Sequence, residues 1–287
     1  MNRAQQKIVA LVDGSVCSAS VGDHAAWISS LTGEPVEVVH VLGRREASQT
    51  QDRSGAIALG ARSALLQELA DLDAQRAKLI GHRGRAILDD ARALLETAGV
   101  AEVTTRLRQG DIVDTLTEVE AEARVVLIGK RGEAADFAKG HLGSNLERIV
   151  RASHRPVFVA SRAFRPIRKV LVAYDGGVSA MKAIDHIAQS AVFQGLEVHV
   201  VTLGHATPDV INGLEDTTAM LRTAGISAES SVRPGQPETA LASIVEDEGF
   251  DMLVMGAYGH SRIRSLIIGS TTTAMIRSCK VPVVLMR

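Results

Sequence analysis

The chain has 287 residues, more than one compact hydrophobic core usually holds, and its length therefore favours two domains. Hydrophobic residues make up 46% and charged residues 23% of the chain, close to the averages of soluble globular proteins, which argues against a disordered or fibrous protein. Residues 1–169 carry 24 Lys and Arg against 21 Asp and Glu, and residues 170–287 carry 8 against 12, so neither half has the basic excess typical of nucleic-acid binding.

The cysteines and the apolar segments of the sequence indicate a cytoplasmic protein. Cys17 and Cys279 have no Cys or His nearby at metal-ligand spacing, which predicts neither a disulfide framework nor a zinc site. Residues 1–7 lead directly into a strand without the apolar stretch of a signal peptide, and no apolar run approaches the ~20 residues of a membrane span. We therefore expect a cytoplasmic protein with neither a membrane nor a nucleic acid as partner.

The chain contains two copies of one pattern. A strand-like run ends in Asp-Gly at residues 8–14 and again at residues 170–176. Each copy closes with Gly-Ser, a helix-like stretch and a Pro-led apolar strand, which occupies residues 156–159 in the first copy and 282–285 in the second. Such internal similarity predicts two copies of one fold, and we place the domains at residues 1–163 and 164–287.

The first copy is longer than the second between its second strand and its second helix. The glycines that bound this stretch are 56 positions apart in the first copy and 21 apart in the second, an excess of 35. Residues 61–80 carry leucine and isoleucine at near-helical spacing, which predicts an added helix that breaks at Gly81 and Gly84. We favour the interpretation that this insertion, around residues 47–85, covers its own domain, with a partner surface as the alternative.

The second copy alternates short apolar runs with amphipathic ones. Its sequence predicts strands at residues 169–174, 196–203, 226–232, 251–255 and 281–286. It predicts helices at residues 179–193, up to residue 223, after Gly235 and Pro237, and at residues 270–278. Strands that alternate with helices, with the central strands apolar throughout and residues 226–232 alternating as an edge strand does, require a parallel sheet covered on both faces. We therefore predict an α/β fold of two repeated doubly wound domains, each a mainly parallel five-stranded sheet with helices on both faces.

A glycine-rich segment of the second copy has the features of a phosphate cradle. Gly256-Ala257-Tyr258-Gly259 follows the fourth strand, and after nine further residues Gly269-Ser270-Thr271-Thr272 opens a helix. Glycines let the backbone turn tightly and approach a ligand closely. The first amides of a helix have no internal partners and attract anions, and Ser or Thr hydroxyls can bond to phosphate or to a bound cation. In a doubly wound sheet such a ligand lies beyond the carboxyl ends of the strands, where the strand order reverses.

This pattern, placed after a distant Asp-Gly and before a Pro-Val-Val-Leu strand, resembles the nucleotide-binding loop of the universal stress protein family. The resemblance covers almost the whole chain as a tandem pair and implies the adenine nucleotide alpha hydrolase-like fold. It also implies a site for ATP or another adenine nucleotide, accompanied by Mg²⁺, whose protein ligands the sequence does not identify. Carried over, the site comprises Asp175, Gly176 and Gly177 beside the nucleoside, Val201 and Thr202 beside adenine, Gly256 and Ala257 beside ribose, and Gly259, Gly269, Ser270, Thr271 and Thr272 beside the phosphates.

The first copy departs from the family pattern. Ten residues instead of nine follow Gly129-Lys130-Arg131-Gly132 before the Gly-Ser pair, and Asn-Leu replaces the Thr-Thr pair. Its Asp-Gly-Ser matches the family better than the Asp-Gly-Gly of the second copy, and Lys130 and Arg131 could meet an anion by charge. We therefore predict the main site in the second copy and a weaker one in the first, comprising Asp13, Ser15, Gly129, Gly132, Gly143 and Ser144.

Several of these residues also have plainer structural interpretations. Asp13 and Asp175 could cap the helices that follow them, and Ser144 and Ser270 could be simple N-caps. We interpret His24 and His186, at equivalent positions in the two copies, as helix-packing residues, and Arg262 and Arg264 as solvated loop charges.

No catalytic constellation is found in the sequence: it contains neither a Ser-His-Asp arrangement with an elbow motif nor a P-loop. We therefore predict a nucleotide-binding universal stress protein, rather than an efficient enzyme, that acts in the stress response through nucleotide-dependent association or signalling. A nucleotide-independent interaction protein and a weak ATPase are the alternatives. The last strands of the two copies are apolar edges, which we expect to pair as an internal pseudo-dimer, and a homodimer of whole chains is left open.

Overall fold

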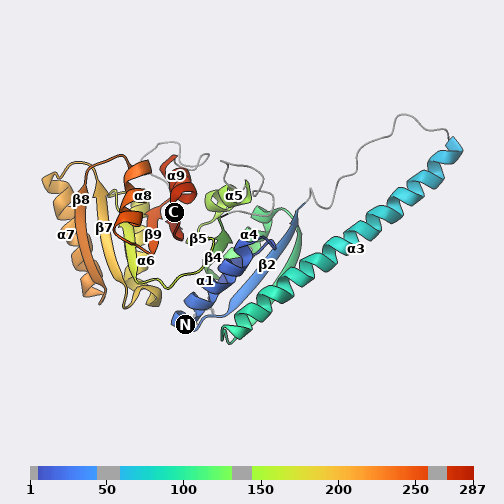
Figure 1. Cartoon of the computed structure of the whole chain (residues 1–287), viewed down its shortest axis with the longest axis horizontal. Coiled ribbons are helices and arrows are strands. Elements are labelled where there is room, and N and C mark those ends of the chain that lie inside the picture. The colour runs from blue at the N-terminus through green and yellow to red at the C-terminus, as the bar shows by residue number, and fades with distance from the viewer. Residues whose placement is uncertain (1–5, 44–58, 131–143, 258–269) are drawn as a thin grey trace.

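The computed structural model of the chain describes residues 6–43, 59–130, 144–257 and 270–287 (Figure 1). The strands of the N-terminal half are β1 (Lys7–Leu11), β2 (Val36–Gly43), β3 (Val103–Gly110), β4 (Ala123–Gly129) and β5 (Val157–Ala160), and its helices are α1 (Cys17–Thr32), α3 (Leu59–Thr97), α4 (Ile112–Glu120) and α5 (Ser144–Ala152). The strands of the C-terminal half are β6 (Lys169–Ala173), β7 (Glu197–Leu203), β8 (Ser227–Arg233), β9 (Met252–Gly256) and β10 (Val283–Met286). Its helices are α6 (Val178–Gln189), the 3₁₀ turn η2 (Ala191–Phe193), α7 (Pro208–Thr223), α8 (Pro237–Asp247) and α9 (Ser270–Ser278).

The strands form one ten-stranded sheet in the order β3-β2-β1-β4-β5-β10-β9-β6-β7-β8. All pairings within each half are parallel. The strand order reverses at β1, which lies between β2 and β4, and again at β6, which lies between β7 and β9. The predicted α/β fold of two doubly wound, five-stranded units is therefore confirmed.

The central strands are apolar because helices cover both of their faces. Ile8, Val9 and Ala10 of β1 alternate between the two faces of the sheet, and all three are fully buried. One hydrophobic core lies under α1, α3, α6 and α7, and the other lies under α4, α5, α8 and α9. Helices on both faces leave the carboxyl ends of the strands as the edge at which a ligand can reach the sheet.

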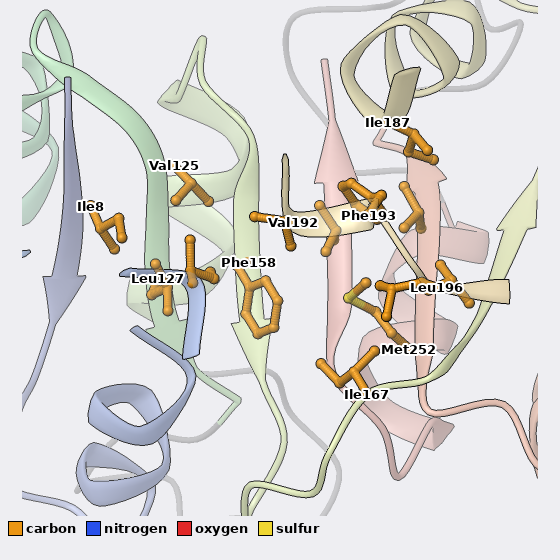
Figure 2. Packing of buried hydrophobic residues seen from close by; sticks show 14 of the residues in the cluster. Ile8, Val125, Leu127, Phe158, Ile167, Ile187, Val192, Phe193, Leu196 and Met252 are labelled. Carbon is orange, nitrogen blue, oxygen red and sulfur yellow. The ribbon is translucent and has the colours of Figure 1, made fainter. Parts of the chain in front are cut away.

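The two halves meet through β5 and β10, which pair antiparallel and place Phe158 opposite Val284. Buried residues of both halves join in one cluster across this junction. Figure 2 shows Phe158 with Leu127 of the N-terminal half on one side and Val192 and Met252 of the C-terminal half on the other. The pairing removes the open edge that each last strand would otherwise present to water.

Two basic side chains also cross between the halves. The amino group of Lys130, directly after β4, donates to the carbonyl oxygen of Cys279, directly after α9. Nη1 of Arg287 donates to the carbonyl oxygen of Arg151 in α5, at 2.6 Å. Each cation therefore lies at the carboxyl end of the last helix of the other half, where the helix dipole favours positive charge.

Helix α3 differs from its predicted form. It runs without interruption from Leu59 to Thr97, so the predicted break at Gly81 and Gly84 is wrong. Gly84 lies against the sheet, and a Cβ atom there would come within 2.8 Å of a methyl group of Leu107. The close packing of helix on sheet that this glycine permits offsets the ~1 kcal/mol that glycine costs inside a helix.

Only part of α3 covers its own half of the chain, contrary to the favoured interpretation. Leu88 and Leu95 are buried in the core shared with α1 and the sheet. Every residue from 65 to 79, in contrast, is exposed. Figure 1 shows this part of α3 extending past the edge of the sheet. The apolar stripe of the insertion is therefore left uncovered by the described residues.

The two equivalent histidines pack within the fold, as predicted. His24 is fully buried, and its ring lies 5.1 Å from those of Phe158 and Phe164. His186 packs edge-on against Phe193 at 6.2 Å. Burial lowers the pKa of His24, and burial together with the positive charge of Arg124 lowers the pKa of His186 to about 4. Both rings are therefore neutral packing groups near neutral pH.

Both cysteines are buried as unpaired thiols. None of the helices in the described ranges has the length and apolar character needed to cross a membrane.

Candidate functional site

The carboxyl ends of β6, β7 and β9 bring together residues predicted for the main site. The register places Ala173 of β6 beside Val201 of β7 and Met255 of β9. Asp175, Thr202 and Gly256 follow within two residues of these positions. The strand order reverses at β6, and a ligand of a doubly wound sheet binds at such a point.

Asp175 shapes the turn between β6 and α6. Its Oδ1 accepts a hydrogen bond of 2.8 Å from the N–H of Gly177, the residue that caps α6. Gly176 has a φ of 71°, in the left-handed region that glycine adopts without strain, and a Cβ atom there would meet no other atom within 4 Å. Asp175 therefore stabilises the turn before α6, but it does not cap the helix as the alternative interpretation proposed, because Gly177 is the N-cap and no side chain caps α6. The Asp175 side chain is exposed at the end of β6.

Strand β7 contributes Val201, which is buried, and Thr202, which is partly buried. The Thr202 hydroxyl donates to the carbonyl oxygen of Tyr174 at 2.8 Å, and the Tyr174 N–H donates to the carbonyl oxygen of Val201 at 2.9 Å. These two hydrogen bonds join the ends of β6 and β7, so Thr202 holds the end of β7 next to Asp175.

Strand β9 ends close to α6 and then connects to α9. A Cβ atom on Gly256 would lie 2.9 Å from Cβ of Ser179, so a larger residue would force the strand and helix apart. The carbonyl oxygen of the buried Ala257 accepts a bond of 3.0 Å from the Thr272 hydroxyl. This hydrogen bond places the first turn of α9 beside the end of β9. Thr272 therefore links the strand to the helix, in addition to its predicted role beside phosphate.

A carboxylate that the sequence analysis did not identify lies next to the first turn of α9. Glu238, in the first turn of α8, accepts a bond of 2.9 Å from the Thr271 hydroxyl through Oε1. Helix α8 is the next element after β8, so the ordering of strands and helices could have placed its first turn at this edge of the sheet. A carboxylate here suits a cation rather than a bare phosphate.

Other predicted residues fall outside the described part of the chain. They are Gly259 and Gly269 of the main site, Gly132 and Gly143 of the weaker site, and Tyr258, Arg131, Arg262 and Arg264. Ser144 and Ser270 begin α5 and α9, as predicted, and their backbone alone is described. Among the described residues, no group of three or more His, Cys, Asp and Glu side chains is arranged to hold a metal ion.

The first copy forms a cavity of about 180 Å³ at the corresponding edge of the sheet. It is lined by Asp13, His40, Leu42, Arg76, Ile80, Arg83, Gly84 and Ile87. Most of these residues belong to α3, which also covers the Asp-Gly turn: a Cβ atom on Gly14 would lie 2.7 Å from Cδ1 of Ile87. Helix α3 therefore lines this cavity and contributes Arg76 and Arg83 to it.

The predicted residues of the weaker site are partly engaged within the fold. Oδ1 of Asp13 accepts bonds from the N–H of Ser15 at 3.0 Å and from the Ser18 hydroxyl at 3.2 Å. His40 Nδ1 donates to the carbonyl oxygen of Val12 at 2.7 Å, the same tie between strands that Thr202 makes in the second copy. Gly129 ends β4, and the following residue, Lys130, donates to the carbonyl oxygen of Cys279 in the other half of the chain.

Comparisons with known proteins agree with this architecture. The model of the universal stress protein family matches the chain twice, at residues 5–161 and 166–287. Universal stress protein Slr1230 of Synechocystis sp. is 37% identical over 286 residues, covering 98% of this chain and 100% of its own. Universal stress protein Rv2005c of Mycobacterium tuberculosis is 26% identical, covering 99% of this chain and 98% of its own. A solved universal stress protein from Archaeoglobus fulgidus has a TM-score of 0.75 at 20% identity and covers 99% of both chains.

Proposed function

Because the chain belongs to the universal stress protein family, we propose that its second copy binds ATP or a related adenine nucleotide at the carboxyl ends of β6, β7 and β9. The observation that carries this proposal is the convergence of Asp175, Thr202 and Gly256 at a reversal of strand order. The first turn of α9 lies beside the same point, so its N-terminal amides and dipole favour an anion there.

In this proposal the protein acts in the cytoplasm as part of a stress response, and the bound nucleotide biases its association or signalling. The antiparallel pair of β5 and β10, with the lysine and arginine contacts that cross the junction, supports treating one chain as an internal pseudo-dimer. Binding is the proposed activity. A nucleotide-independent interaction protein and a weak ATPase are its competitors.

Gly269→Val tests the proposal, because a side chain at this position would occupy space where the backbone meets phosphate. Calorimetric titration with ATP is expected to detect binding to the wild type and none to the variant. The matched control is Gly143→Val, the same change in the first copy, which is expected to retain binding at the second site. Unchanged affinity of Gly269→Val, with circular dichroism verifying the fold of each variant, would contradict the proposal. Turnover of ATP that disappears in Gly269→Val would favour the ATPase.

We propose that Glu238 takes part in binding Mg²⁺ at this site. Carboxylate and hydroxyl oxygens are ligands that Mg²⁺ prefers, and it commonly binds protein carboxylates together with substrate phosphates. Glu238 and Thr271 would hold the ion beside the phosphates.

Glu238→Gln keeps the shape of the side chain without its charge, so this variant is expected to hold Mg²⁺ poorly beside the nucleotide. The same variant is expected to lose most of the gain in affinity that Mg²⁺ gives the wild type. Calorimetric titration with ATP in chelator and in Mg²⁺ measures this loss. The matched control is Glu246→Gln on the same helix, where the carboxylate pairs with the exposed Lys280. Equal Mg²⁺ dependence of the wild type and Glu238→Gln would exclude this role.

A further inference from the structure

The exposed part of α3, residues 65–79, carries an apolar stripe without a partner among the described residues. Leu65, Leu69, Leu72 and Leu79 recur at steps of four, three and seven residues, the spacing by which helices pair as coiled coils. Their exposed fractions run from 38% to 69%. An isolated helical segment of this length is marginally stable in water, and most helical stability comes from packing of an apolar face. We therefore expect another helix to cover this stripe.

The charges on residues 65–85 of α3 indicate what the second helix is. Residues 65–73 contain Glu68, Asp71 and Asp73 and no basic residue. Residues 74–85 contain Arg76, Lys78, Arg83 and Arg85 and no acidic residue. Two copies of this segment side by side in parallel would place like charges together, whereas antiparallel copies place each acidic stretch beside a basic one. The segment is thus complementary to itself in the antiparallel orientation.

We propose that α3 pairs antiparallel with α3 of a second copy of this chain, which makes the protein a homodimer through its inserted helix. A pair centred near residue 74 places Leu69 against Leu79 of the partner subunit, because both residues are five positions from the centre. Leu72 then lies against the alkyl part of Arg76 of the partner subunit. Such a contact uses the same surface on both copies and closes at two subunits by two-fold symmetry.

The arrangement leaves the rest of the fold in place. The carboxyl-terminal part of α3 stays packed in its own core through Leu88 and Leu95, on one side of the proposed centre. The remaining folded parts of the two subunits then lie toward opposite ends of the helix pair. The inference rests on the stripe and its charges, and it stands whether or not the second copy binds a nucleotide.

Sedimentation of the full chain over a dilution series tests the dimer. The wild type is expected to be a dimer that dissociates on dilution, and the double variant Leu69→Glu/Leu72→Glu is expected to dimerise at least about a hundredfold more weakly. The matched control is Leu31→Glu, an exposed leucine of α1, which is expected to dimerise as the wild type does. A wild type that stays monomeric at every concentration, or a dimer that the double variant retains with a native circular dichroism spectrum, would overturn the proposal.

Charge variants test the pairing without removing apolar surface. Glu68→Lys/Asp71→Lys/Asp73→Lys makes the exposed segment basic throughout, and Lys78→Glu/Arg85→Glu makes it mainly acidic. Each variant alone is expected to be monomeric at low salt, and an equimolar mixture is expected to form a heterodimer. Homodimers of either variant as stable as the wild type would contradict the charge pairing.

Single cysteines report the orientation. Gln75 lies next to the proposed centre, so Gln75→Cys is expected to form an intersubunit disulfide on mild oxidation. Glu68→Cys is expected to remain reduced, because antiparallel pairing places it far from its own copy. The native Cys17 and Cys279 are buried and give little background. Cross-linking of Glu68→Cys in place of Gln75→Cys would show the opposite orientation and overturn the proposal.

Discussion

Replacing Phe158 by alanine is expected to lower the free energy of unfolding by about 3–5 kcal/mol, the usual cost of removing a buried phenylalanine ring. Phe158 is 3% exposed and lies opposite Val284 in the strand pair that joins the two halves. Its ring also contacts His24 of α1 at 5.1 Å. The cavity left by the ring would border both halves of the chain. The lost stability therefore comes from the contact that holds the two halves together. Urea denaturation followed by circular dichroism measures the change.

The matched control for this prediction is an apolar residue at the surface. Val178, the first residue of α6, is 66% exposed, and Val178→Ala is expected to change the free energy of unfolding by no more than about 0.5 kcal/mol. A decrease below about 1 kcal/mol for Phe158→Ala would show that the junction contributes little to stability. In that case each half would be held mainly by its own core.

The repeat and the strand patterns predicted most of the fold. Central strands are apolar because both of their faces are covered, as in residues 8–11 of β1 and 252–255 of β9, and this makes them easy to recognise. Helix α9 occupies the predicted residues Ser270–Ser278 because a Gly-Ser start and a following Pro-led strand confine it. These signals are local in the sequence, and both copies repeat them.

The unpredicted features depend on contacts between distant residues. Gly84 suggested a helix break, but the packing of α3 against Leu107 of β3 outweighs the local cost of glycine. The exposure of residues 65–79 depends on where the sheet ends relative to the helix, which no periodicity in α3 reports.

The candidate site also contains both residues that the sequence could predict and contacts that it could not. Its strand-end residues could be predicted, because parallel strands bring their carboxyl ends to one edge and the repeat marks Asp13 and Asp175 as equivalent. The contact between Glu238 and Thr271 could not, because it depends on how α8 packs beside α9. Residues 258–269 lie outside the described part of the chain, so the phosphate contacts assigned to Gly259 and Gly269 remain predictions.

Acidification is expected to destabilise the fold through His186. Its pKa is lowered to about 4 in the folded chain from an ordinary value of 6.5, first by burial and then by the charge of Arg124. The unfolded chain therefore binds more protons than the folded chain between these values. The stability contributed by the neutral ring is complete above about pH 6.5, and it is lost as the pH falls toward about 4. The loss reaches up to about 3 kcal/mol, and the lowered pKa of His24 acts in the same direction.

His186→Leu removes the titrating ring and keeps an apolar side chain against Phe193. Between about pH 7 and pH 4 the free energy of unfolding of this variant is expected to fall by about 2–3 kcal/mol less than that of the wild type. Urea denaturation at a series of pH values measures the difference, and His205→Leu, which removes an exposed histidine, is expected to follow the wild-type profile. Parallel profiles for the wild type and His186→Leu would mean that the ring takes up a proton in the folded chain as readily as in the unfolded one. The contact with Phe193 would then have to tolerate a charged imidazole beside Arg124, which burial in this apolar junction opposes.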